Sequence, residues 1–175
     1  MRAPKTFFDR CVARKMTDWS LWQPRELATL CLVRDHERIL MIRKKRGLGA
    51  GKINGVGGRL ERGELPLAGI LREAREELGI TLTDPIKRGE LHFQFVDGYS
   101  LFCTVFVASR FAGTPIETEE AVPLWFDLCQ LPFNEMWEDD KLWLPQALEG
   151  RSFRGFFVFD GEKMLSSQLD WEPQQ

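Results

Sequence analysis

Three glutamates in one short stretch of the chain could hold a metal ion. Glu73, Glu76 and Glu77 follow one another at spacings of i, i+3 and i+4, so on a helix their carboxylates share one face. Carboxylate oxygens are the ligands that Mg²⁺ prefers, and a cation would remove the repulsion between the three charges. The alternative is an ordinary acidic helix face exposed to solvent.

The residues before these glutamates decide between the two interpretations. Residues 58–80 read GRLERGELPLAGILREAREELGI, in which Gly58, Glu64 and Arg72 precede the acidic run. The glycine-rich run that ends at Gly58 lets the backbone come close to a phosphate or a metal ion. A glycine loop, an isolated glutamate and an arginine have no reason to accompany a merely solvated helix face. The pattern therefore favours metal-dependent chemistry on a phosphate group.

Local signals predict the helix that must carry the glutamates. Pro66 stands at its start and Gly79 just past its end, which is the usual asymmetry of helix termini. Apolar residues recur between them at helical spacing, namely Leu67, Ile70, Leu71, Ala74 and Leu78. We therefore predict a helix over residues 66–78 with one buried face.

Alternating and β-branched segments predict strands around this helix. They cover residues 27–33, 38–42, 87–95, 99–109, 121–127 and 153–159. Asp97-Gly98 predicts a hairpin turn between two of them. Residues 44–57 are predicted to form a basic, glycine-containing loop, and residues 139–148 a second helix. This order indicates an α/β (α+β) fold, with a mixed β-sheet sandwiched between helices.

Length and charge limit the class of protein. A chain of 175 residues with a net charge of −2 fits one domain that lacks a general basic surface, so we expect neither nucleic acid nor membrane as a partner. We divide it into an N-terminal extension at residues 1–25, a domain at 26–165 and a C-terminal tail at 166–175. The extension is basic and acid-poor, which fits a flexible arm, a short docking segment or an organelle-targeting peptide.

The cysteines indicate a reducing compartment. Cys11, Cys31, Cys103 and Cys129 form no C-x-x-C pair, and two of them, Cys31 and Cys103, lie in apolar strand-like runs. We predict reduced core thiols and a cytoplasmic location.

The same residues carry a family resemblance. Gly58, Glu64, Arg72, the three glutamates and Gly79 stand in the order G-x5-E-x7-R-E-U-x-E-E-x-G-U, where U is aliphatic or small and is filled by Ala74 and Ile80. This resembles the signature of the Nudix hydrolases, which cut nucleoside diphosphates linked to another group. The resemblance implies a Nudix fold and a divalent metal ion, Mg²⁺ with Mn²⁺ as an alternative.

Four further runs narrow the resemblance to one branch of the family. LGAGKINGVGGRLERGE, GTPIETEE, LPFNEMWEDD and FRGFFVF resemble the animal MutT homologues, which hydrolyse oxidised purine nucleoside triphosphates. The likeness extends over residues 29–159. Glu138 stands where the branch has proline, and the turn between Phe95 and Leu101 is one residue shorter.

The resemblance implies roles for particular residues. The metal ligands would be the carbonyl of Gly57 with Glu73, Glu76, Glu77 and Glu120, and Arg72 would pair with Glu64 to hold the loop against the helix. The nucleotide would contact Thr29, Lys44, Asn54, Val56, Gly57, Gly58 and Arg59. The base would lie among Phe93, Phe95, Leu101, Trp137, Glu138, Asp139, Asp140, Trp143 and Phe159.

Elementary chemistry supports a base site around Trp137. A purine needs an aromatic face to stack on and polar groups at its edge, and Trp137 is followed closely by Asp139 and Asp140. Two adjacent carboxylates in an apolar setting are costly unless one is protonated or something binds them. We predict that Asp139 is protonated and Asp140 ionised. Phe93 and Phe95 alternate as on a strand, which fits core packing as well as a pocket wall.

The predicted function is Mg²⁺-dependent hydrolysis of oxidised or otherwise modified purine nucleoside triphosphates to the monophosphate and pyrophosphate, by a monomer. One glutamate that the metal does not saturate, Glu76 or Glu120, would act as general base. Two alternatives stay open: a Nudix pyrophosphohydrolase of another nucleoside diphosphate-linked substrate, and a Nudix domain that only binds a nucleotide.

Overall fold

A nine-stranded mixed sheet forms the centre of the molecule. The computed structural model describes residues 17–173. Seven strands follow one another in the order β11-β10-β6-β7-β1-β2-β3, while β4 pairs with β1 and β9 pairs with β2. The strands are β1 (Glu26–Asp35), β2 (Arg38–Lys44), β3 (Ile53–Asn54), β4 (Val56–Arg59), β6 (Ile86–Phe95), β7 (Ser100–Ala108), β9 (Ala121–Asp127), β10 (Phe153–Asp160) and β11 (Lys163–Trp171). Two short strands, β5 (Thr81–Thr83) and β8 (Arg110–Ala112), pair separately.

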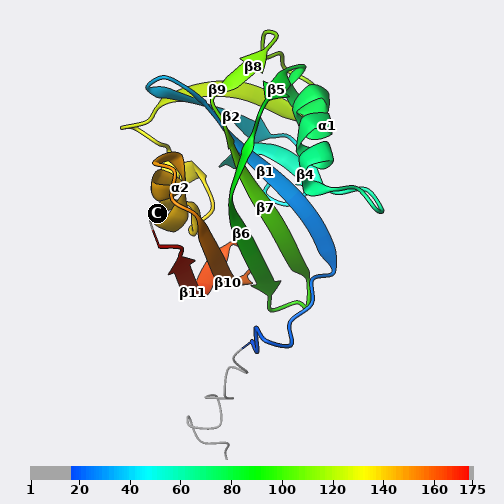
Figure 1. Ribbon diagram of the computed structural model, residues 1–175. Coiled ribbons are helices and arrows are strands. Elements are labelled where there is room, and N and C mark those ends of the chain that lie inside the picture. Colours follow the sequence, from blue (N-terminus) through cyan, green and yellow to red (C-terminus); the bar gives the residue numbers. More distant parts are fainter. Residues whose placement is uncertain (1–16, 174–175) are drawn as a thin grey trace, which may run out of the picture.

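Two helices cover opposite faces of this sheet (Figure 1). Helix α1 (Pro66–Leu78) buries Ile70, Ala74 and Leu78 in one hydrophobic core, and Gly79 ends it in the left-handed conformation with φ 69°. Helix α2 (Asp140–Leu148) buries Trp143 and Leu144 in the other core. The predicted mixed sheet between helices is confirmed, and both helices lie where they were expected to within one residue.

Alternation along the strands separates the two faces. In β10, Phe153, Phe157 and Phe159 are buried on the side of α2, while Phe156 points to the opposite side and is partly exposed. The pairs β1–β7 and β6–β10 are parallel and the remaining pairs antiparallel. A parallel pair joins distant segments, so β10 and β6 bring the end of the chain against its middle.

Five strands were not expected from the sequence. Residues 44–57 were predicted as loop, but β3 and β4 begin within them, and β5 and β8 are only three residues long. The fifth, β11, crosses the expected domain boundary at residue 165 and pairs with β10 along its length. The division into a domain ending at 165 and a tail was therefore wrong, because residues 166–171 complete the sheet.

The described part of the N-terminal extension is packed against the domain. Trp22 donates a hydrogen bond to Gln94, and Trp19 lies 5.3 Å from the ring of Phe156. The expectation of a flexible arm is therefore wrong for residues 17–25. Residues 1–16, with Cys11 and any targeting signal, lie outside the described residues.

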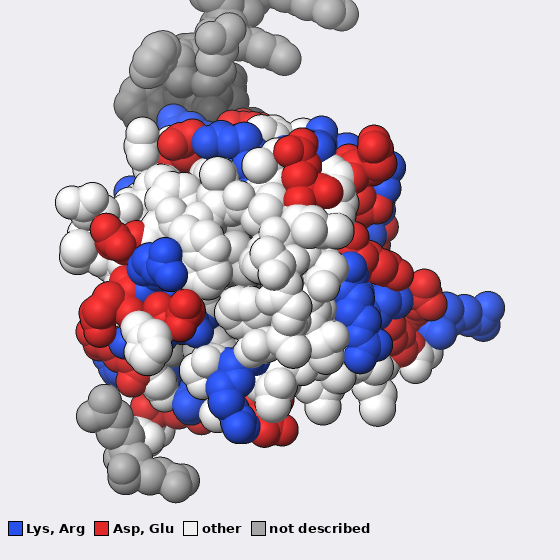
Figure 2. Space-filling model, turned by 90° about the horizontal axis from the view of Figure 1, so that it is seen from above, with Lys and Arg blue, Asp and Glu red and all other residues white. Residues whose placement is uncertain are grey.

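The surface carries both signs of charge. In the view of Figure 2, Lys and Arg are interspersed with Asp and Glu around a central area of uncharged residues. Within residues 17–173, no helix is long and apolar enough to cross a membrane. Cys31 and Cys103 are free and buried, as predicted, whereas Cys129 is exposed.

Candidate active site

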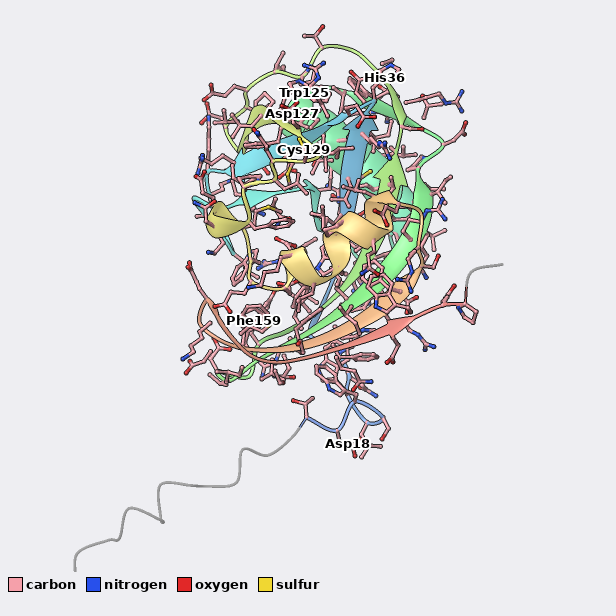
Figure 3. All side chains as sticks on the ribbon, turned by 90° about the vertical axis from the view of Figure 1, so that its left-hand side faces the viewer. Asp18, His36, Trp125, Asp127, Cys129 and Phe159 are labelled. Atoms are coloured by element: carbon pink, nitrogen blue, oxygen red, sulfur yellow. The ribbon has the colours of Figure 1, made fainter. Side chains whose placement is uncertain are left out.

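One cavity of about 440 Å³ opens along the sheet and contains most of the predicted site residues. Its wall includes predicted positions from both ends of the chain: Thr29, Lys44, Asn54, Gly57, Gly58, Arg59, Glu73, Glu77, Phe93, Phe95, Leu101, Glu120, Trp137, Asp139, Asp140, Trp143 and Phe159. The glutamates gather at one end of the cavity, and the aromatic rings with the two aspartates lie at the other. Phe159, labelled in Figure 3, lies on the side of the curved sheet that faces α2.

The carboxylate end forms where α1 meets β4. Glu77 is 3 % exposed and accepts a hydrogen bond of 3.0 Å from the backbone nitrogen of Gly57. A Cβ atom on Gly58 would lie 2.5 Å from a carboxylate oxygen of Glu73, which is 7 % exposed. A Cβ at this position would push the Glu73 carboxylate aside, so Gly58 leaves room for this carboxylate beside β4.

Arg72 binds the loop to the helix. Its guanidinium donates two hydrogen bonds of 2.9 Å to Glu64 and one of 3.1 Å to the carbonyl oxygen of Arg59. It also contacts Glu73 at 2.9 Å and Glu76 at 2.8 Å. The two charge-assisted bonds from Arg72 lower the pKa of Glu64 to about 2, so this carboxylate stays ionised. The expected Arg72–Glu64 pair is present.

Burial and like charges perturb the other carboxylates of this end. Burial raises the pKa of Glu77 to about 7, and the negative charges of Glu73 and Glu120 add to that rise. Burial likewise raises the pKa of Glu73, although Arg72 opposes the shift. Carboxylates that destabilise each other's charge in this way favour a cation between them.

The donor set suits a hard divalent cation. Glu73, Glu77 and Glu120 line the same cavity and supply the oxygen ligands that Mg²⁺ or Mn²⁺ takes. Among residues 17–173, no three acidic groups are placed so that they could hold a metal ion together. Arg72 contacts Glu73 and Glu76, and Arg46 contacts Glu120. The residues fit a metal ion by the chemistry of their oxygen donors.

The opposite end of the cavity is an aromatic slot. The rings of Phe95 and Phe159 stack with centroids 5.7 Å apart. Trp137 stands across this pair, nearly perpendicular to Phe159 at 89° and 5.4 Å. Lys52 lies 5.2 Å from the Trp137 ring centroid and bonds to Glu162 at 3.0 Å, which holds the indole from outside. Aromatic faces of this kind are what a purine ring stacks on.

Two buried aspartates lie in the wall of this slot. Asp139 and Asp140 are 1 % and 4 % exposed. One oxygen of Asp139 accepts a 2.9 Å hydrogen bond from the indole of Trp143, and one of Asp140 accepts a 3.1 Å bond from the backbone nitrogen of Trp137. The other oxygen of Asp139, Oδ1, is buried without a hydrogen-bond partner. A buried acceptor left in this state in a cavity wall is suited to a donor on a ligand.

Burial raises the pKa of both aspartates. The pKa of Asp139 rises to about 6, moderated by the hydrogen bond from the Trp143 indole. The pKa of Asp140 rises well above its ordinary value, and the charge of Asp139 adds to that shift. Two adjacent carboxyls that both favour the protonated form are expected to share one negative charge at most, as the sequence predicted. The assignment of the proton to Asp139 stays a prediction.

Five predicted site residues lie outside the cavity wall, and two of them, Glu64 and Arg72, form the ion pair described above. Val56 is fully buried in the core beneath α1, Glu138 is exposed, and Glu76 points to Arg72. The wall also contains residues that sequence reasoning missed: Ala28, Leu30, Arg46, Gly47, Leu48, Leu91, Tyr99 and Cys103. Arg46 to Leu48 lie in the basic glycine-containing loop, whose charge was the available signal. Nothing local in the sequence distinguishes Tyr99 or Cys103 from other strand residues.

The chain is similar to known proteins over most of its length. The NUDIX domain family model matches residues 24–147. The chain is 40% identical over 141 residues to the oxidized purine nucleoside triphosphate hydrolase of Danio rerio, a match that covers 80% of this chain and 90% of the relative. It is 42% identical over 145 residues to the protein of that name from Mus musculus, with 82% and 93% covered.

A solved structure shows the same fold. The crystal structure of a MutT protein from Bacillus halodurans superposes with a TM-score of 0.74 at 28% identity, covering 85% of this chain and 99% of the other. Together with the carboxylate helix, its arginine clamp and the glycine loop, these matches establish that the chain belongs to the Nudix hydrolase family.

Proposed function

We propose that this chain hydrolyses oxidised purine nucleoside triphosphates to the monophosphate and pyrophosphate. The observation that carries the proposal is a single cavity in which the buried carboxylates Glu73 and Glu77 and an aromatic slot with Asp139 and Asp140 lie in one wall. A nucleotide with its triphosphate at the first end and its base at the second would use both. The animal relatives are named for this activity.

The aspartate pair suits the edge of an oxidised guanine. This edge presents N–H donors at N1 and N2 and an acceptor at O6. The free Oδ1 of Asp139 can accept from a donor, and the protonated member of the pair can donate to O6. Trp137 and Phe95 would enclose the ring. Moving the proton within the pair would fit other oxidised purine edges.

At the phosphate end the carboxylates would hold Mg²⁺. Its ligands would be Glu73, Glu76, Glu77, Glu120 and the carbonyl of Gly57, and Mg²⁺ would neutralise phosphate charge and lower the pKa of the attacking water. Lys44 and Arg59 line the same end of the cavity and would bind phosphate oxygens. A glutamate that the metal does not saturate, Glu76 or Glu120, would accept the proton of water.

A substrate panel tests the proposal. Turnover is measured by release of pyrophosphate and monophosphate from oxidised purine triphosphates, plain purine triphosphates, a dinucleoside polyphosphate, a nucleotide sugar and a capped RNA, each with Mg²⁺, Mn²⁺ or chelator. We expect the highest kcat/KM on an oxidised purine triphosphate and none with chelator. Preference for another member of the panel would assign a different Nudix substrate. Binding without any turnover would assign a nucleotide-binding domain.

A further inference from the structure

Residues 17–25, here called the N-terminal strap, cover the face of the sheet opposite the aromatic slot. Figure 3 shows the segment with Asp18 on the outer side of the curved sheet and α2 on the other side. Trp19 and Trp22 pack together at 5.5 Å. Trp22 then meets His92 of β6 at 5.3 Å, and Trp19 meets Phe156 of β10 at 5.3 Å.

Hydrogen bonds join the strap to the two strands of the β6–β7 hairpin. The indole nitrogen of Trp22 donates to the side-chain oxygen of Gln94 at 2.9 Å. The backbone nitrogen of Arg25 donates to the backbone oxygen of Ser100 at 3.2 Å and to its hydroxyl at 3.0 Å. The strap is therefore bonded at the closed end of the hairpin, on both sides of its turn.

Gln94 connects Trp22 to the turn between β6 and β7. Its side-chain nitrogen donates to the backbone oxygens of Phe95, at 2.9 Å, and Tyr99, at 3.1 Å. An indole N–H can only donate, so Trp22 requires the oxygen of the Gln94 amide to face it, and the amide nitrogen must then face the two carbonyls. The indole and the two carbonyls favour the same orientation of the amide, so Trp22 adds a third hydrogen bond that ties this amide and the turn to the strap.

The same turn carries part of the base slot on its other face. Gln94 points outward, and its neighbour Phe95 points into the cavity, as strand alternation requires. Phe95 packs on Phe159 at 5.7 Å, on Trp137 at 6.3 Å and on Tyr99 at 5.5 Å. A shift of the hairpin end would therefore move the aromatic wall against which the base lies.

We infer that Trp22 is a positioning residue for the base slot: acting through Gln94, it holds the turn that carries Phe95 and Tyr99. The inference rests on the proposed function, because it assigns a role in binding the purine. It predicts that loss of the indole N–H weakens substrate binding while the phosphate chemistry at the far end of the cavity continues.

Two matched substitutions test this role. Trp22→Phe keeps an aromatic ring against His92, but it removes the donor to Gln94 together with part of the ring surface. Trp19→Phe makes the same change in the neighbouring ring, for which the described contacts include no hydrogen bond from the indole. The two variants and the wild type are compared by thermal midpoint, kcat and KM on 8-oxo-dGTP and on dGTP.

For Trp22→Phe we expect KM for 8-oxo-dGTP to rise about threefold to tenfold, the scale of one hydrogen bond, with kcat within about a factor of two. Trp19→Phe should change neither constant by more than about twofold, as expected for a conservative ring substitution.

A double-mutant cycle separates positioning from general stabilisation. Gln94→Leu removes the link itself, so Trp22→Phe should add no further rise in KM when Gln94 is already Leu. Additive effects, equal effects of Trp19→Phe and Trp22→Phe, or failure of Trp22→Phe to fold would each overturn the inference and leave Trp22 a structural residue. Turnover by the wild type distinguishes failure of the proposed function from failure of the role of Trp22. If the wild type does not turn over 8-oxo-dGTP, the proposed function fails, whereas normal wild-type turnover with unchanged variants contradicts only the role of Trp22.

Discussion

At the scale of single residues, the site depends on carboxylates that are kept out of water. Glu77 and Asp139 are both nearly inaccessible, and burial raises the pKa of each. An ionised carboxylate in such a place is costly unless a cation or a hydrogen-bond donor accompanies it. Both ends of the cavity therefore gain stability from a ligand of defined chemistry, a cation at one end and N–H groups at the other.

Glu77→Gln tests the first of these ends. The amide oxygen of Gln can still accept from the backbone nitrogen of Gly57, so the fold should persist, but a neutral amide is a much poorer ligand for a divalent cation. We expect kcat/KM to fall by roughly a hundredfold or more, with the thermal midpoint unchanged within a few degrees. Glu119→Gln is the control, because Glu119 is exposed and outside the cavity. Near-normal turnover of Glu77→Gln would remove Glu77 from the metal site.

Asp139→Asn tests the second end through the pH dependence of stability. The folded-state pKa of Asp139, about 6, lies above the ordinary value of 3.8, so the folded protein binds this proton more tightly than the unfolded chain. The resulting stabilisation is complete below about pH 4 and is lost as the pH rises through about 6. Urea unfolding in the presence of chelator, from pH 4 to 8, should show the wild type losing roughly 2–3 kcal/mol more than Asp139→Asn. Parallel curves would mean that the pKa of Asp139 is not raised.

At the scale of elements, α1 and the loop before it act as one unit because of Arg72. The helix alone presents the glutamates, but their distance from β4 depends on the loop. Arg72 bonds to Glu64 and to the carbonyl of Arg59, and Gly58 leaves room for Glu73. The guanidinium can serve these acceptors together because its donors form a rigid planar fork.

Arg72→Lys keeps the charge and loses the fork. A lysine ammonium cannot reach Glu64, Arg59 and Glu73 at the same time, so the loop should separate from the helix. We expect a loss of roughly 1–3 kcal/mol in unfolding free energy and a drop in kcat of about tenfold or more. The matched change Arg75→Lys, on an exposed position of the same helix, should alter neither. If the two variants behave alike, the clamp has no role in holding the loop.

At the scale of the whole molecule, the sheet is complete only with its last strand. Strand β11 pairs with β10, and its Trp171 packs on Phe153 of β10 with ring centroids 5.5 Å apart. The guanidinium of Arg151 lies 4.5 Å from the centroid of the Trp171 ring. Strand β10 in turn supplies Phe159 to the slot. The end of the chain therefore supports the base site without touching the base.

Truncation measures this contribution. A chain ending after Glu162 lacks β11, which leaves β10 as an unpaired edge and uncovers Phe153. Unpaired apolar edges promote aggregation, so we expect this chain to be insoluble or to unfold at least about 10 °C lower, a loss of roughly 3 kcal/mol or more. A chain ending after Trp171 keeps the strand and should match the full-length protein in melting temperature. Equal stability of the two truncated chains would show that β11 is dispensable.

Local signals in the sequence determined the catalytic helix and the family. Pro66 and Gly79 mark the ends of α1, and Ile70, Ala74 and Leu78 define its buried face, because caps and periodicity act within a few residues. The spacing of the glutamates then follows from helix geometry alone. Most strands were predictable for the same reason, since alternation of apolar residues is a local property.

Tertiary structure decided the features that depend on distant partners. Strand β11 has no fully buried residue, so its sequence carries little alternation, and only its pairing with β10 makes it a strand. The strap is held by Gln94, 72 residues away from Trp22. The position of the proton between Asp139 and Asp140 depends on how each carboxylate is buried and on the indole of Trp143. Burial and electrostatic fields arise from the whole packed molecule, so no local pattern in the chain contains them.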